Sequence, residues 1–239
     1  MIKSTLKSFL RSLGWKLHRV NPATDPFAQT IAVLNHVGSN IIFDVGANVG
    51  QFALGIRASG FNGKIISFEP LARAHSKLLT ASRRDPAWTI HSRTAIGNKD
   101  GEINVNISGN SVSSSVLPML ELHAEASKNS AYVGIETVPV ARLDTIAFSY
   151  LSQNCRLFLK IDTQGFEWEV LDGALETLKL SHGVLLEMTL VPLYEGQRLW
   201  QDVIERMKLH GFALWSIQPG FTDLQTGRTL QVDAIFLRI

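Results

Sequence analysis

The stretch IIFDVGANVGQF (residues 41–52) decides the fold. An apolar run leads into Asp44, Gly46 and Gly50 follow with a spacing of four, and an amphipathic run begins near Asn48. This order is typical of a buried strand that gives way to a helix. In sheets built from such units, ligands bind at the carboxyl ends of strands, where the strand order reverses. The stretch therefore marks a plain structural turn, a phosphate cradle or a pocket for a nucleoside cofactor.

The glycine spacing narrows these alternatives. A phosphate-binding G-x-x-x-x-G-K-S/T loop is absent from the sequence. The dinucleotide pattern G-x-G-x-x-G also fails, because Asn48 and Gln51 stand where glycines are needed. What remains is D-x-G-x-x-x-G, with Glu69 at the end of the next predicted strand. A carboxylate there can accept hydrogen bonds from both ribose hydroxyls, and a helix N-terminus suits an amino-acid carboxylate. S-adenosylmethionine has both groups; a bare turn with a solvated Glu69 stays open.

The rest of the chain alternates predicted strands and helices. The strands are 41–45, 64–68, 88–92, 157–161, 184–189, 212–217 and 231–237; the helices are 27–37, one from about Asn48, 71–82, 166–179 and 197–210. This predicts an α/β fold with a doubly wound, mostly parallel seven-stranded sheet. The last two strands are joined only by a loop, which predicts an antiparallel C-terminal strand. A Ser-rich insert at about 101–140 contains SGNSVSSSVLP (108–118), which is too polar for a core and is predicted to be a lid.

The composition of the chain excludes several classes of protein. The chain has 239 residues, 45% of them hydrophobic, and one cysteine, Cys155, so an internal disulfide is excluded. No apolar run approaches the roughly 20 residues that span a bilayer. We therefore expect a cytoplasmic protein. Residues 1–20 hold five of the 23 Lys and Arg residues and no acid, so residues 21–239 are slightly acidic. That balance argues against a nucleic-acid partner.

Residues 1–26 are predicted to be a basic amphipathic helix followed by a linker, and residues 27–239 to be the main domain. At 100° per residue, the apolar positions of the helix share one arc: Ile2, Leu6, Phe9, Leu10, Leu13 and Leu17. Residues 2–19 could lie on an anionic membrane surface, at the inner face of the membrane. Docking of this helix on its own domain or on a second subunit stays open. Asn21-Pro22 and Asp25-Pro26 indicate the linker.

Several longer motifs, in order along the chain, resemble one family. They are FDVGANVGQF, SFEP, AIGNKDGEI, SSSVLP, RLDTI, LKIDTQGFEWEVLDGA and VLLEMTLVPLYEG. From about residue 30 to the C-terminus the chain resembles FkbM-family methyltransferases. The resemblance implies a class I, Rossmann-like methyltransferase fold, S-adenosylmethionine as donor, and O-methylation of a sugar or polyketide-like hydroxyl. One departure is Gln164, which stands where many members carry Glu.

The resemblance also implies roles for single residues. Asp44, Gly46, Asn48 and Gly50 would line the methionine end of the donor, Glu69 would bind its ribose, and Thr94 and Ala95 would flank the adenine. The full expected cofactor-binding set is Asp44, Gly46, Ala47, Asn48, Gly50, Gln51, Glu69, Pro70, Thr94, Ala95 and Asp162. A strand end without ligand is the alternative for Thr94 and Ala95.

Three residues are candidates for catalysis. Asp162 and Glu187 both end predicted strands that face the same crevice, and either could act as the general base that an alcohol nucleophile needs. Asp162 could instead stabilise the sulfonium or orient the methionine amine. His123 lies near the insert and would reach the site if the insert closes, whereas His91 reads better as a hydrogen-bonded core histidine. A divalent metal on these carboxylates stays open, and no metal ligand is assigned.

The expected function is S-adenosylmethionine-dependent transfer of a methyl group to a sugar hydroxyl in a glycan, glycolipid or related natural product. Two alternatives stay open: a catalytically inactive nucleoside-binding regulator or scaffold, and a nicotinamide oxidoreductase. The expected partner is a small-molecule or glycan acceptor, and homo-oligomerisation stays open.

Overall fold

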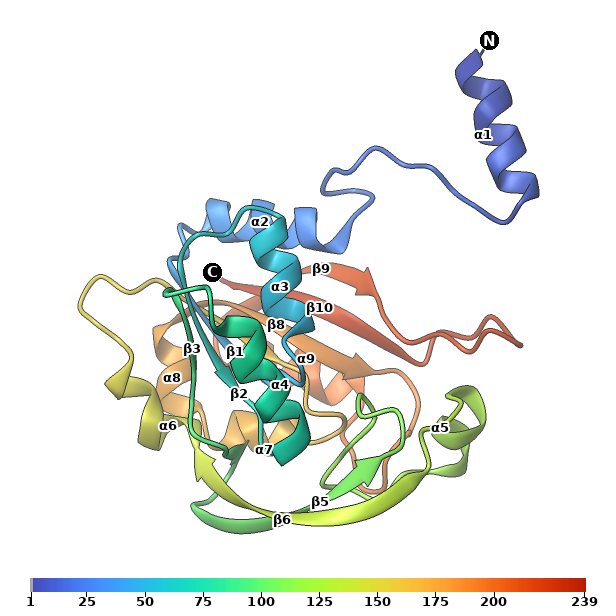
Figure 1. Ribbon diagram of the computed structural model, residues 1–239. Helices are drawn as coiled ribbons and strands as arrows, with labels where there is room; N and C mark the ends of the chain where they lie inside the picture. The colour runs from blue at the N-terminus through green and yellow to red at the C-terminus, as the bar shows by residue number, and fades with distance from the viewer. Residues whose placement is uncertain (1) are drawn as a thin grey trace.

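A seven-stranded sheet forms the centre of the computed structural model, which describes residues 2–239 and the side chains of residues 7–239 (Figure 1). Its order is β3-β2-β1-β7-β8-β10-β9. The strands are β1 (Ile41–Val45), β2 (Lys64–Phe68), β3 (Trp88–Ile90), β7 (Leu157–Ile161), β8 (Ser181–Thr189), β9 (Phe212–Pro219) and β10 (Gln231–Arg238). Strands β1, β2, β3, β7 and β8 pair in parallel, whereas β10 is antiparallel to both neighbours. The predicted doubly wound sheet with an antiparallel C-terminal strand is confirmed.

The strand order reverses between β1 and β7, the two fully buried central strands. From β1 the chain winds outward through β2 to β3, and it then returns to pair β7 with the other edge of β1. A crevice opens at the carboxyl ends of strands on either side of such a switch point. The DVGANVG turn after β1 and the DTQG turn after β7 therefore meet at one end of the sheet.

Helices cover both faces of the sheet. On one face, α2 (Pro26–His36), α3 (Gln51–Ala58) and α4 (Ala72–Ser82) contribute Leu34, Ile56 and Leu78 to one buried cluster. On the other face, α6 (Leu143–Ile146), α7 (Glu167–Asp172), α8 (Leu175–Leu180) and α9 (Trp200–Leu209) contribute to a second cluster. A short 3-10 helix, η1 (Ala147–Ser149), follows α6. Burial on both faces explains why the central strands are continuous apolar runs.

The single helix predicted over 166–179 is wrong. The segment forms α7 and α8, which break at Gly173. A Cβ at Gly173 would lie 1.8 Å from the carbonyl oxygen of Gly97, so the backbone there packs directly against the strand β4 (Ala95–Gly97). No residue with a side chain would fit at this break without moving the β4 backbone.

The insert forms a small sheet of its own, with the order β4-β6-β5. Strand β5 (Gly101–Ser108) pairs antiparallel with β6 (Tyr132–Arg142), and α5 (Glu121–Ala126) lies between them in sequence. Figure 1 shows this sheet at the end of the molecule opposite α1. The SGNSVSSSVLP segment lies between β5 and α5 in sequence. It is hydrogen-bonded to β5, and Ser113 and Ser115 in it are buried. It is therefore an ordered part of the fold, and its motion as a lid stays a prediction.

The N-terminal helix is shorter than predicted. Helix α1 (Ile2–Ser12) ends where Gly14 adopts a left-handed conformation, with φ of 79°. The Trp15 N–H donates to the Leu10 carbonyl at 2.8 Å, which closes the helix end. Leu13 and Leu17 thus lie beyond the helix. The Asp25-Pro26 pair, predicted as linker, starts α2, because the Asp25 carboxylate accepts from the Ala28 N–H at 2.7 Å. No helix within residues 2–239 has the length and apolarity to cross a membrane.

Candidate functional site

A pocket opens at the switch point, between the carboxyl ends of β1, β2 and β7 and the Ser-rich segment of the insert. Its volume is about 210 Å³. Nine of the eleven predicted cofactor-binding residues line it: Gly46, Ala47, Asn48, Gln51, Glu69, Pro70, Thr94, Ala95 and Asp162. Residues far apart in sequence thus converge on the place that the strand order predicts.

The turn after β1 takes its shape from its glycines. Gly46 has a φ of 76°, and a Cβ there would lie 1.7 Å from the Asp162 carbonyl oxygen. Asn48 and Gly50 also have positive φ, of 48° and 94°, so α3 begins at Gln51 and not at Asn48 as predicted. The Asn48 Oδ1 atom is buried and has no hydrogen-bond partner in the described structure. A buried acceptor on a pocket wall fits a ligand that brings a hydroxyl or ammonium donor.

The Glu69 carboxylate is fixed at the end of β2. One oxygen accepts from the Asn48 N–H and the other from the Leu71 N–H, both at 2.8 Å. The residue is 5% exposed, and burial raises the pKa of Glu69 to about 7, although the two N–H donors oppose this shift. Each oxygen keeps a second lone pair, so the ionised group can still accept from two vicinal hydroxyls on the pocket side.

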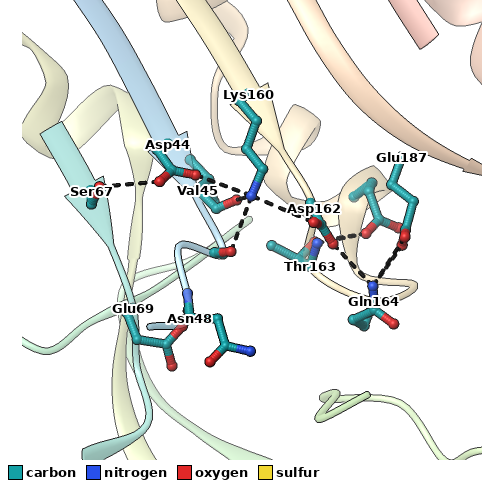
Figure 2. Close-up of polar contacts among 12 residues, drawn as sticks. Asp44, Val45, Asn48, Ser67, Glu69, Lys160, Asp162, Thr163, Gln164 and Glu187 are labelled. Carbon is teal, nitrogen blue, oxygen red and sulfur yellow. Dashed lines mark hydrogen bonds and ion pairs between the residues drawn. The ribbon is translucent and has the colours of Figure 1, made fainter. Parts of the chain in front are cut away.

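A buried lysine joins the two central strands (Figure 2). Asp44 and Lys160 are register partners on β1 and β7, and Lys160 Nζ lies 3.0 Å from Asp44 Oδ1 and 3.5 Å from Asp162 Oδ2. It also donates to the Gly46 carbonyl at 3.1 Å. Burial disfavours the charge of Lys160, but the two carboxylates outweigh this and raise its pKa. The resulting cation ties the glycine turn to Asp162.

Gln164 bridges two carboxylates beside the pocket. Figure 2 shows its amide nitrogen between Asp162 and Glu187, with distances of 3.0 Å to Asp162 Oδ1 and 2.9 and 3.1 Å to the Glu187 oxygens. Because this nitrogen can only donate, the facing oxygens must accept. Gln164 has a φ of 55°, which few non-glycine residues adopt. The amide thus lies between two carboxyl groups that would repel each other if both were ionised.

Tyr194 sets the orientation of the Gln164 amide, on the side away from the two carboxyl groups. Tyr194 Oη lies 3.1 Å from Gln164 Oε1 and 3.2 Å from His123 Nε2. Burial lowers the pKa of His123, which favours the neutral ring, and its Nδ1 has no partner within the described residues. If Nε2 carries the ring proton and donates to Tyr194, the single Tyr194 proton is left for one of two acceptors, of which Gln164 Oε1 at 3.1 Å is nearer than the Ser113 carbonyl oxygen at 3.3 Å. This arrangement directs the Gln164 nitrogen towards the carboxylates.

Four predictions need correction in position. Asp44 and Gly50 lie behind the pocket wall: Asp44 is fully buried against Lys160, and a Cβ on Gly50 would meet Trp88. His123 is 2% exposed and packs on Tyr194 and Phe221, so it does not enter the pocket. Glu187 also stands off the wall, separated from the pocket by Gln164. These residues support the site and do not line it.

The Glu187 carboxyl is buried, and burial favours its protonated form. The pKa of Glu187 is raised well above its ordinary value by burial first, and then by Asp162 and Glu167. Gln231 donates to its carboxylate at 2.7 Å. Asp162 is more open, with 35% of its side chain exposed. Of the two strand-end acids, Asp162 is therefore the one that can meet a substrate.

The sequence analysis missed Glu167, which lies at this end of the sheet. Glu167 accepts from the Thr163 and Gly165 N–H groups at 2.8 and 3.0 Å and so fixes the turn that carries Asp162 and Gln164. The available signal was an acid in the first turn of a helix that follows a glycine turn, where the positive end of the helix dipole favours it. His91, by contrast, lies as its alternative predicted: it bonds Tyr150 Oη at 2.7 Å, outside the pocket lining.

The insert supplies a polar side of the pocket. Ser111, Ser114 and Ser115 line it together with Val112 and Val116. Ser115 Oγ donates to the Gln164 carbonyl at 2.6 Å, which fastens the insert to the DTQG turn. The segment therefore forms part of the pocket lining, and its motion as a lid stays a prediction. Among the described side chains, no group of three His, Cys, Asp or Glu residues is placed to hold a metal ion.

One family model and several solved structures are similar to this chain. A sequence model of the methyltransferase FkbM domain matches residues 44–214, more than half of the chain. A comparison with curated proteins found no match. Among solved structures, Aeropyrum pernix fibrillarin in complex with S-adenosyl-L-methionine is 11% identical, with a TM-score of 0.46 over 84% of this chain and 66% of that one.

Two further solved structures are similarly distant. A SAM-dependent methyltransferase from Aquifex aeolicus is 11% identical, with a TM-score of 0.45 over 92% of this chain and 100% of that one. TehB from Haemophilus influenzae is 6% identical, with a TM-score of 0.47 over 88% of this chain and 62% of that one. These likenesses are too remote to assign a substrate. The match over residues 44–214 shows that the chain belongs to the FkbM methyltransferase family.

Proposed function

We propose that this methyltransferase transfers a methyl group from S-adenosylmethionine to a hydroxyl of a sugar in a glycan, glycolipid or related natural product. The observation that carries the proposal is the Asp162 carboxylate. It lies on the pocket wall beside the glycine turn and is held by Lys160 and Gln164. An acceptor hydroxyl must lose a proton as it is methylated, and this carboxylate is placed to receive it.

The pocket suits S-adenosylmethionine on three observations. Glu69 offers two carboxylate oxygens for ribose hydroxyls. Asn48 Oδ1 is a buried acceptor without a partner among the described residues, and it suits the methionine ammonium. Gln51 and Phe52 open α3 on the pocket wall, where helix-start N–H groups suit a carboxylate. When bound, the donor supplies an electrophilic methyl group on a sulfonium.

The protein's contribution is positioning and proton acceptance. Holding the hydroxyl oxygen and the methyl carbon about 3–3.5 Å apart can supply roughly 7–11 kcal/mol of the barrier. A positioned base typically contributes 10²–10⁴-fold in rate. Lys160 and Gln164 hold Asp162 with both oxygens in place, and the Asp162 side chain stays 35% exposed towards the acceptor.

The class of acceptor follows from the lining on the insert side. The hydroxyls of Ser111 and Ser114, together with the Asn48 side chain, offer donors and acceptors to a molecule rich in hydroxyl groups. The slightly acidic composition of residues 21–239 disfavours a nucleic-acid acceptor. A sugar is rich in hydroxyl groups and is not a nucleic acid, so it fits both observations.

The test is a methyl map of the host's surface glycans, made by mass spectrometry and NMR with and without this protein. The proposal predicts one O-methyl sugar that disappears when the protein is absent. Purified chain should restore it in extracts supplied with S-adenosylmethionine. Tight donor binding with no methylated product in any extract would instead favour the inactive nucleoside-binding regulator.

A further inference from the structure

Residues 2–20 form an arm that takes no part in the site. Figure 1 shows α1 standing away from the domain at the end of an extended segment. The described apolar side chains of this arm are largely exposed, with Phe9 60%, Trp15 71% and Val20 71% accessible. Docking of the helix on its own domain, which the sequence left open, is not observed within the described residues, and the side chains named here have no cover in the monomer.

Charge is concentrated on the same arm. Residues 1–20 carry Lys3, Lys7, Arg11, Lys16 and Arg19 and no Asp or Glu, whereas residues 21–239 carry 18 basic and 21 acidic residues. In projection along α1 at 100° per residue, Lys7 and Arg11 lie one turn apart on one side, Phe9 lies opposite them, and Leu10 falls between Phe9 and Lys7. The arm thus combines exposed apolar side chains with a net positive charge.

The combination selects one kind of partner. A nucleic acid would neutralise the positive charges but would leave Phe9, Leu13 and Trp15 in water. A membrane interface with anionic lipids accepts both, because apolar side chains enter the acyl boundary while Lys and Arg remain among the headgroups. Trp15, next to Lys16, is the kind of side chain that sits at this boundary. We propose that residues 2–20 bind the surface of an anionic lipid bilayer.

Because α1 is short, we expect lipid binding to increase its helicity. An isolated helix of 11 residues is marginal in water, because helices below about 12–15 residues do not repay their nucleation cost. Burying one apolar side at an interface stabilises it. Helix α1 therefore gains helicity when the arm binds lipid, and the domain is carried to the surface.

The experiment is co-sedimentation of the full chain with large vesicles, at low and at high salt. One set is phosphatidylcholine alone, and the other contains phosphatidylglycerol as well. The chain should sediment with the second set and not with the first, and salt should weaken this binding. Circular dichroism should show added helix, and Trp15 fluorescence, taken as the difference from a Trp15→Phe variant, should shift to shorter wavelength.

Matched variants locate the effect. Replacing Lys7, Arg11, Lys16 and Arg19 by Gln should weaken binding by about fivefold for each charge removed. The control replaces four exposed basic residues of the domain by Gln (Arg83, Arg84, Lys99 and Lys128), and should bind as the wild type does. A Phe9→Ser/Trp15→Ser variant should also lose binding. None of these residues lines the pocket.

Three results would overturn the proposal. The first is the absence of binding to phosphatidylglycerol vesicles. The second is an equal loss of binding in the control and arm variants. The third is self-association, measured by light scattering without lipid, that the Phe9→Ser/Trp15→Ser variant abolishes, because a second copy would then cover the apolar side. Each result leaves the methyltransferase proposal unaffected, since donor binding is measured separately.

Discussion

Gln164→Glu tests whether the amide bridge holds the catalytic end of the sheet together. The change keeps the side-chain length but turns a donor, at 2.9–3.1 Å from Asp162 and Glu187, into a third carboxylate. Two hydrogen bonds to charged groups are lost. At the low end of 1.5–3 kcal/mol each, taken because these side chains are partly exposed, the loss is about 3 kcal/mol.

The loss depends on pH, with a definite sign. The new carboxyl is crowded by two acids, so its folded-state pKa lies above its unfolded value. Such a group supports the fold below the unfolded pKa, and that support is lost as pH rises through the folded pKa. The free energy of unfolding of Gln164→Glu should therefore be closest to that of the wild type at about pH 4, below the ordinary glutamate pKa, and about 3 kcal/mol below it at pH 8.

Denaturant unfolding at the two pH values measures this difference, with Gln164→Met as the control. The methionine side chain fills the same space and loses the same hydrogen bonds, but it adds no titrating group, so its deficit should vary much less with pH. A second readout is turnover, which should fall at pH 8 in Gln164→Glu more than donor affinity does. If the two variants lose the same stability at both pH values, the bridge does not work by separating charges.

The remaining predictions concern the donor pocket and pH. Glu69→Ala should weaken binding of S-adenosylmethionine by about 1.5–3 kcal/mol, the range for hydrogen bonds to a charged group, and unchanged affinity by calorimetry would rule out the ribose contact. Gly46→Ala should abolish donor binding, because its Cβ would overlap the Asp162 carbonyl oxygen, whereas Gly60→Ala, also at positive φ but in open space, should retain it in the same assay. The wild type should melt at a lower temperature at pH 8 than at pH 5.5, because burial raises the pKa of Glu69 and of Asp233 to about 7, and native-state support from such groups fades as pH rises; a higher melting temperature at pH 8 would contradict this.

The sequence predicted best what depends on local pattern. The strands at 41–45, 64–68 and 157–161 were placed to the residue, because buried apolar runs between turn signals leave little choice of boundary. The pocket residues after β1 and β2 followed from the rule that ligands bind at strand ends. Nine of the eleven predicted residues line the pocket for that reason.

What failed depends on contacts between distant segments. The helix breaks at Gly173, where the Gly97 backbone packs against it, and nothing near Gly173 in the sequence predicts that contact. Asp44 looked like a ligand residue, but its register with Lys160 turns it inward to form an ion pair. His123 was expected in the site, yet Tyr194 stands between it and Gln164. Pairing across strands and packing of the insert decide these positions.

The central claim is that Asp162 receives the proton of an acceptor hydroxyl during methyl transfer. The most direct measurement compares the wild type with Asp162→Asn, using donor labelled in the methyl group and a glycan extract that the wild type methylates. Turnover should fall by about 10²–10⁴-fold, while calorimetry shows donor affinity little changed, because the base acts on the acceptor. Equal losses in turnover and donor affinity, or a variant as active as the wild type, would contradict the account.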